Sequence, residues 1–129
     1  MIRTLSCHCG QVRLEVNAEL GELSECNCST CARHGMLHWR IRPDQVRLAT
    51  PRSGLSTYVW RFITEGHYFC KTCGTQIART GPNNYVSINA RCLDNIDIFT
   101  LKVRREDNRT RIPGGDVPPL ADDGPEPAS

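Results

Sequence analysis

The chain has 129 residues, of which 39% are hydrophobic, 23% are charged and only 6% are aromatic. This length fits one domain of ordinary size, and the composition excludes a fibrous or wholly disordered protein. All 16 Lys and Arg residues but only 10 of the 14 Asp and Glu residues lie in 1–112, a balance of +6 without a concentrated basic run. With so few aromatic residues for base stacking, a nucleic-acid partner is not expected.

The N-terminal residues lead into Cys7 without an apolar stretch long enough for a signal peptide or a membrane span. We therefore expect a cytoplasmic protein without a membrane partner. Thiols stay reduced in that compartment, so the 8 cysteines indicate metal ligands rather than disulfides.

Short segments that alternate apolar and polar residues, separated by Gly and Pro, predict a mainly β fold with a single domain. Strands are predicted at 11–16, 37–41, 46–49, 55–62, 68–69, 75–79, 85–89 and 97–103. One short helix is predicted at Ser29–His34, which Cys28 or Ser29 can start and Gly35 can end.

The C-terminal segment differs from the rest of the chain. Residues 113–129 are rich in Pro and Gly, carry four acidic residues, and offer too few apolar side chains to offset the entropy of ordering them. We expect a domain at 1–112 followed by a flexible acidic tail at 113–129.

Seven of the eight cysteines fall into three groups. These are Cys7-His8-Cys9-Gly10, Cys26-Asn27-Cys28-Ser29-Thr30-Cys31 and Cys70-Lys71-Thr72-Cys73-Gly74. A Cys-x-x-Cys-Gly sequence forms a metal-binding knuckle, because the glycine permits the tight turn that directs both thiolates at one ion. The first and third groups both end in glycine and look like halves of a four-cysteine site, although the spacing alone permits other pairings.

The middle group offers three thiolates within six residues and no obvious fourth ligand. An open coordination position is typical of catalytic zinc. Alternatively, His34, His38 or Cys92 completes a structural site with these three cysteines. Cys92 can equally be an inert buried thiol, the common fate of a lone cysteine.

Four stretches together resemble the glutathione-dependent formaldehyde-activating enzyme family, also called the CENP-V/GFA domain, over about residues 4–112. They are Ser6–Val12, Cys26-x-Cys28-x-x-Cys31, Phe69-Cys70-x-x-Cys73-Gly74-Thr75 and Val86–Asp94. The resemblance implies an Mss4-like β fold with two zinc ions. It implies a structural zinc on Cys7, Cys9, Cys70 and Cys73, and a catalytic zinc on Cys26, Cys28 and Cys31.

The family's characterised activity is a carbon–sulfur lyase reaction that forms S-hydroxymethylglutathione from glutathione and formaldehyde. A zinc ion with three thiolates still favours the thiolate form of a fourth thiol, which can then attack an aldehyde carbon. His34 is the candidate proton donor to the resulting oxygen, because it lies closest in sequence to the three cysteines. His38 and His67 are weaker candidates, and His8 is expected to point away from the metal.

Other roles remain open at this point. Arg33 and Arg91 can pair with the carboxylates of a glutathione-like ligand or be solvated surface residues. Both zinc ions can instead be structural, in a non-catalytic module that binds a protein or a nucleic acid. A redox or metal-buffering protein is a third possibility. The sequence does not indicate an oligomeric state.

Overall fold

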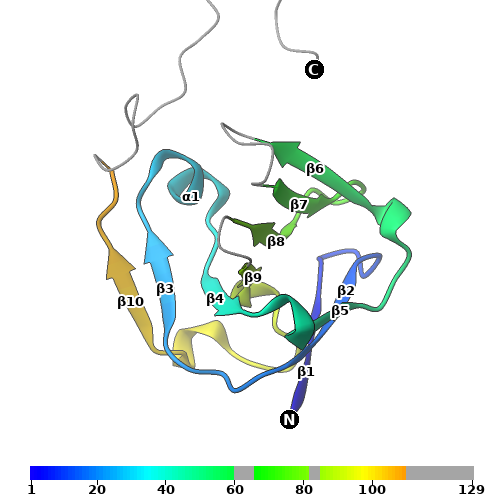
Figure 1. The fold of residues 1–129 in the computed structure, drawn as a ribbon, viewed down its shortest axis with the longest axis horizontal. Coiled ribbons are helices and arrows are strands. Elements are labelled where there is room, and N and C mark those ends of the chain that lie inside the picture. Colours follow the sequence, from blue (N-terminus) through cyan, green and yellow to red (C-terminus); the bar gives the residue numbers. More distant parts are fainter. Residues whose placement is uncertain (60–65, 82–84, 110–129) are drawn as a thin grey trace, which may run out of the picture.

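A computed structural model describes residues 1–59, 66–81 and 85–109. Ten strands and one helix are assigned there (Figure 1). They are β1 (Ile2–Ser6), β2 (Arg13–Asn17), β3 (Leu23–Cys26), α1 (Ser29–His34), β4 (His38–Ile41), β5 (Val46–Leu48), β6 (Leu55–Val59), β7 (Gly66–Cys70), β8 (Gln76–Thr80), β9 (Val86–Asn89) and β10 (Val103–Glu106). Within these ranges no helix is long and apolar enough to span a membrane.

The strands form two sheets. The larger has seven strands in the order β10-β3-β4-β9-β8-β7-β6, and the smaller has three in the order β1-β2-β5. Neighbouring strands are antiparallel except β10 and β3, which run parallel. In Figure 1 the larger sheet follows an arc, with α1 inside the arc and the smaller sheet outside it. The two sheets therefore face each other across one side of the arc, and α1 covers the other.

The core lies between the two sheets. Leu5, Val12 and Val16 from the N-terminal part are fully buried, and they belong to one cluster with Ile77 and Ile88 of the larger sheet. Cross-strand partners share a face of a sheet, so Tyr68, Ala78, Ile88 and Trp39 form an apolar row facing this core. Burial of this face is the main force that holds the sheets together.

The opposite face of the larger sheet carries polar side chains. Five residues oppose one another in register across five consecutive strands, and we call them the polar row: Tyr58, His67, Arg79, Ser87 and Arg40. His38, two residues before Arg40 on β4, lies on the same face because side chains alternate along a strand. This face is the one that α1 covers.

The helix α1 begins and ends as the sequence predicts. The Cys28 side chain caps it by accepting from the backbone N–H of Cys31, and Gly35 ends it with a positive φ of 66° while donating to the Cys31 carbonyl. Glycine adopts this left-handed conformation without strain, and a residue in that conformation cannot continue the helix, so α1 ends there.

The structure differs from the strand predictions in three places. β1 and β3 were not predicted, and residues 97–103 are not one strand: Ile98–Thr100 forms a 3-10 turn and β10 begins only at Val103. Asp97 causes the turn, because its carboxylate accepts from the Phe99 N–H at 3.0 Å and its carbonyl accepts from the Thr100 hydroxyl at 2.6 Å. The end of the strand predicted at 55–62, the domain boundary at 112 and the tail at 113–129 lie outside the described residues.

Candidate functional site

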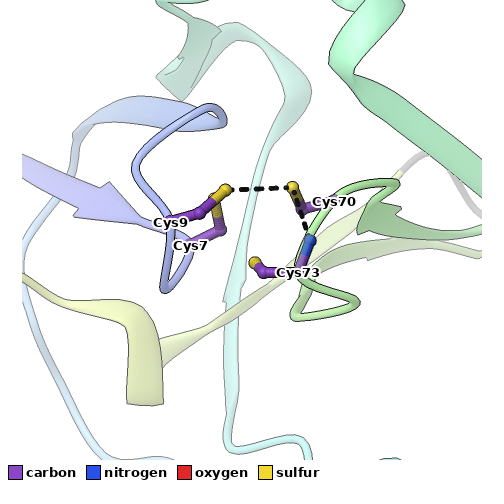
Figure 2. A group of neighbouring side chains, drawn as sticks. All are labelled: Cys7, Cys9, Cys70 and Cys73. Atoms are coloured by element: carbon purple, nitrogen blue, oxygen red, sulfur yellow. Dashed lines mark hydrogen bonds between the residues drawn. The ribbon is translucent and has the colours of Figure 1, made fainter.

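The first cysteine group consists of two loops that meet from distant parts of the chain. Cys7 and Cys9 follow β1, Cys70 ends β7, and Cys73 comes three residues later. Their four sulfur atoms all lie within 4.8 Å of one another. In Figure 2 the sulfur atoms gather between the two loops. The structure therefore brings together the four residues that the sequence resemblance assigned to one site.

The geometry of this group fits a tetrahedral zinc ion. Four sulfur atoms at about 2.3 Å from one ion lie about 3.8 Å apart. The Sγ atoms of Cys7 and Cys9 are 3.7 Å apart, and those of Cys9 and Cys70 are 3.6 Å apart. Gly10 and Gly74 have φ angles of 83° and 79°, so both loops contain the positive-φ turn that the knuckle requires.

Backbone N–H groups face the sulfur atoms of these loops. The Val12 N–H donates to the Cys7 sulfur at 3.3 Å, and the Thr72 N–H donates to the Cys70 sulfur at 3.4 Å. Such hydrogen bonds favour the thiolate form, which is the form that binds a metal. Four sulfur ligands fill every position of a tetrahedral site, so this group suits a structural metal.

The second group lies where β3 ends and α1 begins. The sulfur atoms of Cys26, Cys28 and Cys31 also lie within 4.8 Å of one another. Cys26 is half-buried, whereas Cys28 and Cys31 are buried. The Cys28 N–H donates to the Cys26 sulfur and the Cys31 N–H to the Cys28 sulfur, each at 3.5 Å. The N-cap of α1 is therefore also a member of the candidate metal-binding group.

Two side chains from elsewhere contact this three-cysteine group. The Asn108 side-chain amide donates to the Cys26 sulfur at 3.2 Å, and Nε2 of His38 lies 3.3 Å from the Cys31 sulfur. The other nitrogen of His38, Nδ1, lies 2.6 Å from the Ser87 hydroxyl of the polar row. Partners of this kind orient metal ligands and tune their basicity.

The sequence left open whether a fourth ligand completes this group. In the described parts of the chain, no further Cys, His, Asp or Glu atom joins the three sulfur atoms within 4.8 Å. Of the three sulfur atoms, Nε2 of His38 contacts that of Cys31 alone among the contacts of the described residues. Cys92 is buried, its sulfur lies 3.7 Å from the Gln76 carbonyl, and burial raises the pKa of its thiol to about 12. The three-cysteine group therefore offers three protein ligands.

Electrostatics favour a thiolate within this group. A hydrogen bond from the Cys31 thiol, helped by the Thr30 hydroxyl and the Cys31 N–H, lowers the pKa of Cys28 to about 4. The pKa of Cys31 is raised because the same hydrogen bond holds its proton. The donor set is thus of the soft, thiolate kind that zinc prefers.

A cavity of about 410 Å³ opens beside Cys26, at the edge of the three-cysteine group. Its lining residues are Glu25, Cys26, Asn27, Ala32, Arg105, Glu106 and Asp107. The volume lies in the range of small-molecule sites. Because Cys26 is part of the wall, a molecule in this cavity lies next to one member of the cysteine group.

The histidines divide into different environments. The ring of His34 lies at the end of α1, 6.1 Å from the ring of Tyr58 and 5.2 Å from that of His67. Desolvation lowers the pKa of His34, while the charge of nearby Cys28 opposes this shift. His8 is exposed and outside both cysteine groups. His38 and His67 are buried, so His34 is the solvent-exposed histidine near the three-cysteine group among the described residues.

The two arginines proposed for ligand binding are engaged in structural contacts. Arg91 donates to the Gly35 carbonyl at 2.8 Å and to Glu25 at 3.2 Å, so it links the end of α1 to β3. Arg33 donates to the Ser29 carbonyl within α1 at 3.0 Å. Sequence reasoning missed Asn108, Ser87 and Arg105, because nothing in their local sequence reports proximity to the cysteines.

Comparison with known proteins identifies the family. The glutathione-dependent formaldehyde-activating enzyme family matches residues 2–106. A crystal structure of a Rhodobacter sphaeroides protein, solved as a structural-genomics target, is 25% identical and superposes with a TM-score of 0.70, covering 78% of this chain and 99% of that one. The predicted mainly β, Mss4-like fold class is confirmed. The chain belongs to the glutathione-dependent formaldehyde-activating enzyme (GFA) family.

Proposed function

We propose that this protein is a zinc-dependent enzyme of the carbon–sulfur lyase class, which joins glutathione to formaldehyde at Cys26, Cys28 and Cys31. The observation that carries the proposal is a three-thiol group beside a cavity of about 410 Å³. The family match supports the choice of substrates. The cytoplasm is the proposed compartment, because glutathione stays reduced there.

The two cysteine groups would play different roles. Cys7, Cys9, Cys70 and Cys73 would hold a structural zinc, because they fill all four tetrahedral positions. A zinc ion held by Cys26, Cys28 and Cys31 supplies one further position, at which a thiol is bound and loses its proton more readily. Two zinc ions per chain are thus expected.

The chain's own residues would hold the substrate and move its proton. The cavity holds the glutathione main chain, and Arg105 in its wall, whose guanidinium lies 3.6 Å from the Glu25 carboxylate, provides a cation that a substrate carboxylate would share with Glu25. His34 accepts the proton of the substrate thiol. The sulfur electron pair then forms the C–S bond, the C=O π pair moves to oxygen, and His34 returns the proton to that oxygen. The reaction needs no net proton and no oxidant, and the lyase direction reverses these steps.

The experiment combines metal analysis with a rate measurement. Freshly purified protein is expected to contain about two zinc ions per chain. Magnetisation-exchange NMR between glutathione and S-hydroxymethylglutathione is expected to show faster exchange with the wild type than with buffer, and the uncatalysed rate with Cys28→Ser. Full zinc content without any acceleration would refute the enzymatic proposal and favour a non-catalytic zinc module. A single zinc ion, or iron, would refute the two-site assignment.

A further inference from the structure

His67 is a buried residue with one ring nitrogen that the structure leaves without a partner. It lies on β7, in the polar row, and only 2% of its surface is exposed. Its Nδ1 atom lies 3.1 Å from the Gln76 side-chain amide nitrogen. Its Nε2 atom has no hydrogen-bond partner among the described residues. A buried polar group without a partner costs about 1–3 kcal/mol, so it calls for an explanation.

The partner of Nδ1 decides which nitrogen carries the proton. With the Gln76 side-chain nitrogen facing Nδ1, the amide N–H donates to Nδ1, which is then the unprotonated nitrogen of a neutral imidazole. Oε1 of the same amide, like Nε2 of His67, has no partner among the described residues. Burial lowers the pKa of His67 to about 4, and electrostatic interactions with Arg79 and His34 act in the same direction. The ring is therefore neutral near pH 7. In this orientation of the Gln76 amide the proton sits on Nε2, and Nε2–H is a donor without an acceptor among the described residues.

The surroundings of His67 connect it to the three-cysteine group. Its ring centre lies 5.2 Å from that of His34, which ends the helix α1 that also carries Cys31. Arg79 opposes both His67 and Ser87 in register, and Ser87 contacts His38, whose Nε2 lies 3.3 Å from the Cys31 sulfur. The donor thus lies next to the proposed proton carrier and directly opposite the cation of Arg79. Negative charge that develops on a substrate oxygen would be stabilised in this place.

We propose that Nε2–H of His67 donates a hydrogen bond to the aldehyde oxygen during attack by the thiolate. This assignment rests on the proposed function and adds a catalytic residue to it. As the C–S bond forms, the C=O π pair moves to oxygen, and that oxygen accepts the hydrogen bond from His67 while the proton comes from His34. His67 keeps its own proton throughout. Gln76 is the positioning residue that fixes the tautomer.

Two variants separate this role from a purely structural one. His67→Leu removes the donor, whereas His67→Gln retains an N–H donor at about the position of Nε2. Loss of one such donor lowers kcat by about 100-fold. We expect that loss for His67→Leu, with about two zinc ions and unchanged glutathione affinity, and a kcat within about tenfold of wild type for His67→Gln. A zinc-replete His67→Leu protein with wild-type kcat would overturn the proposal, as would equal losses in both variants.

A second measurement uses the unmodified protein and does not depend on variant folding. Long-range ¹H–¹⁵N NMR of the histidine rings should show His67 as the Nε2–H tautomer. Its Nε2 signals should move on addition of glutathione with formaldehyde, and not with glutathione alone. A protonated Nδ1, or no response to formaldehyde, would overturn the assignment. If the wild type does not accelerate exchange at all, the proposed function fails first and this assignment fails with it, whereas an active wild type with a silent His67 refutes only the assignment.

Discussion

Replacing one cysteine in each group should separate the two sites. Cys28→Ser is the informative change in the three-cysteine group, because Cys28 is both a proposed ligand and the N-cap of α1. Serine is a preferred N-cap, so this substitution removes a metal ligand while it keeps a helix cap. Cys70→Ser is the matched change in the four-cysteine group.

The structure gives the expected difference in stability. The four-cysteine group joins Cys9 to Cys70, which are 61 positions apart, whereas the three-cysteine group spans only six residues. Loop-closure entropy grows as (3/2)RT ln n, so losing the cross-link between distant segments costs about 2 kcal/mol more than losing the local one. For a domain of this size, that difference is roughly 10 °C in Tm.

Zinc analysis, circular dichroism and the exchange assay test this together. Cys28→Ser should keep its β spectrum, retain about one zinc ion and lose exchange activity. Cys70→Ser should be insoluble or unfolded, because structural zinc binding contributes directly to folding. Equal destabilisation by the two substitutions would show that the three-cysteine group is also structural. Cys28→Ser with full exchange activity would place the chemistry elsewhere.

Three further predictions concern Asn108, His67 and the C-terminal segment 113–129. Asn108→Ala removes the amide donor to the Cys26 sulfur and should weaken zinc binding at that group about 10–100-fold in a chelator competition, whereas the exposed Asn17→Ala should not; equal affinities would show that the contact is incidental. His67 has a pKa of about 4 in the folded protein and 6.5 when exposed, so its contribution to stability is complete above pH 6.5 and falls as the pH drops towards 4. Over that range the free energy of unfolding of the wild type should fall, relative to that of His67→Gln, by at most about 1.4 kcal/mol per pH unit. A difference in urea melts that stays constant with pH would contradict this. Deletion of residues 113–129 should leave Tm and zinc content unchanged, and a large fall in Tm would show that the segment packs on the domain.

Several strands show why sequence reasoning recovers some elements and not others. The segments at β2, β4 and β9 alternate apolar and polar residues, because one face of each meets the core, and they were predicted. β10 has the sequence Val-Arg-Arg-Glu and buries little, so its pattern carries no strand signal. It is a strand because it pairs in parallel with β3, a contact between segments about 80 positions apart.

The sequence by itself determined the features that depend on local interactions. The bounds of α1 follow from the cap at Cys28 and the glycine at Gly35, and the three cysteine groups follow from the spacing of their ligands. The tertiary structure alone decided what comes together over long distances. Strand register aligns the polar row on the face beneath α1, brings Asn108 to Cys26, and leaves Nε2 of His67 buried beside His34. These contacts depend on pairing between distant segments, and no local propensity encodes such pairing.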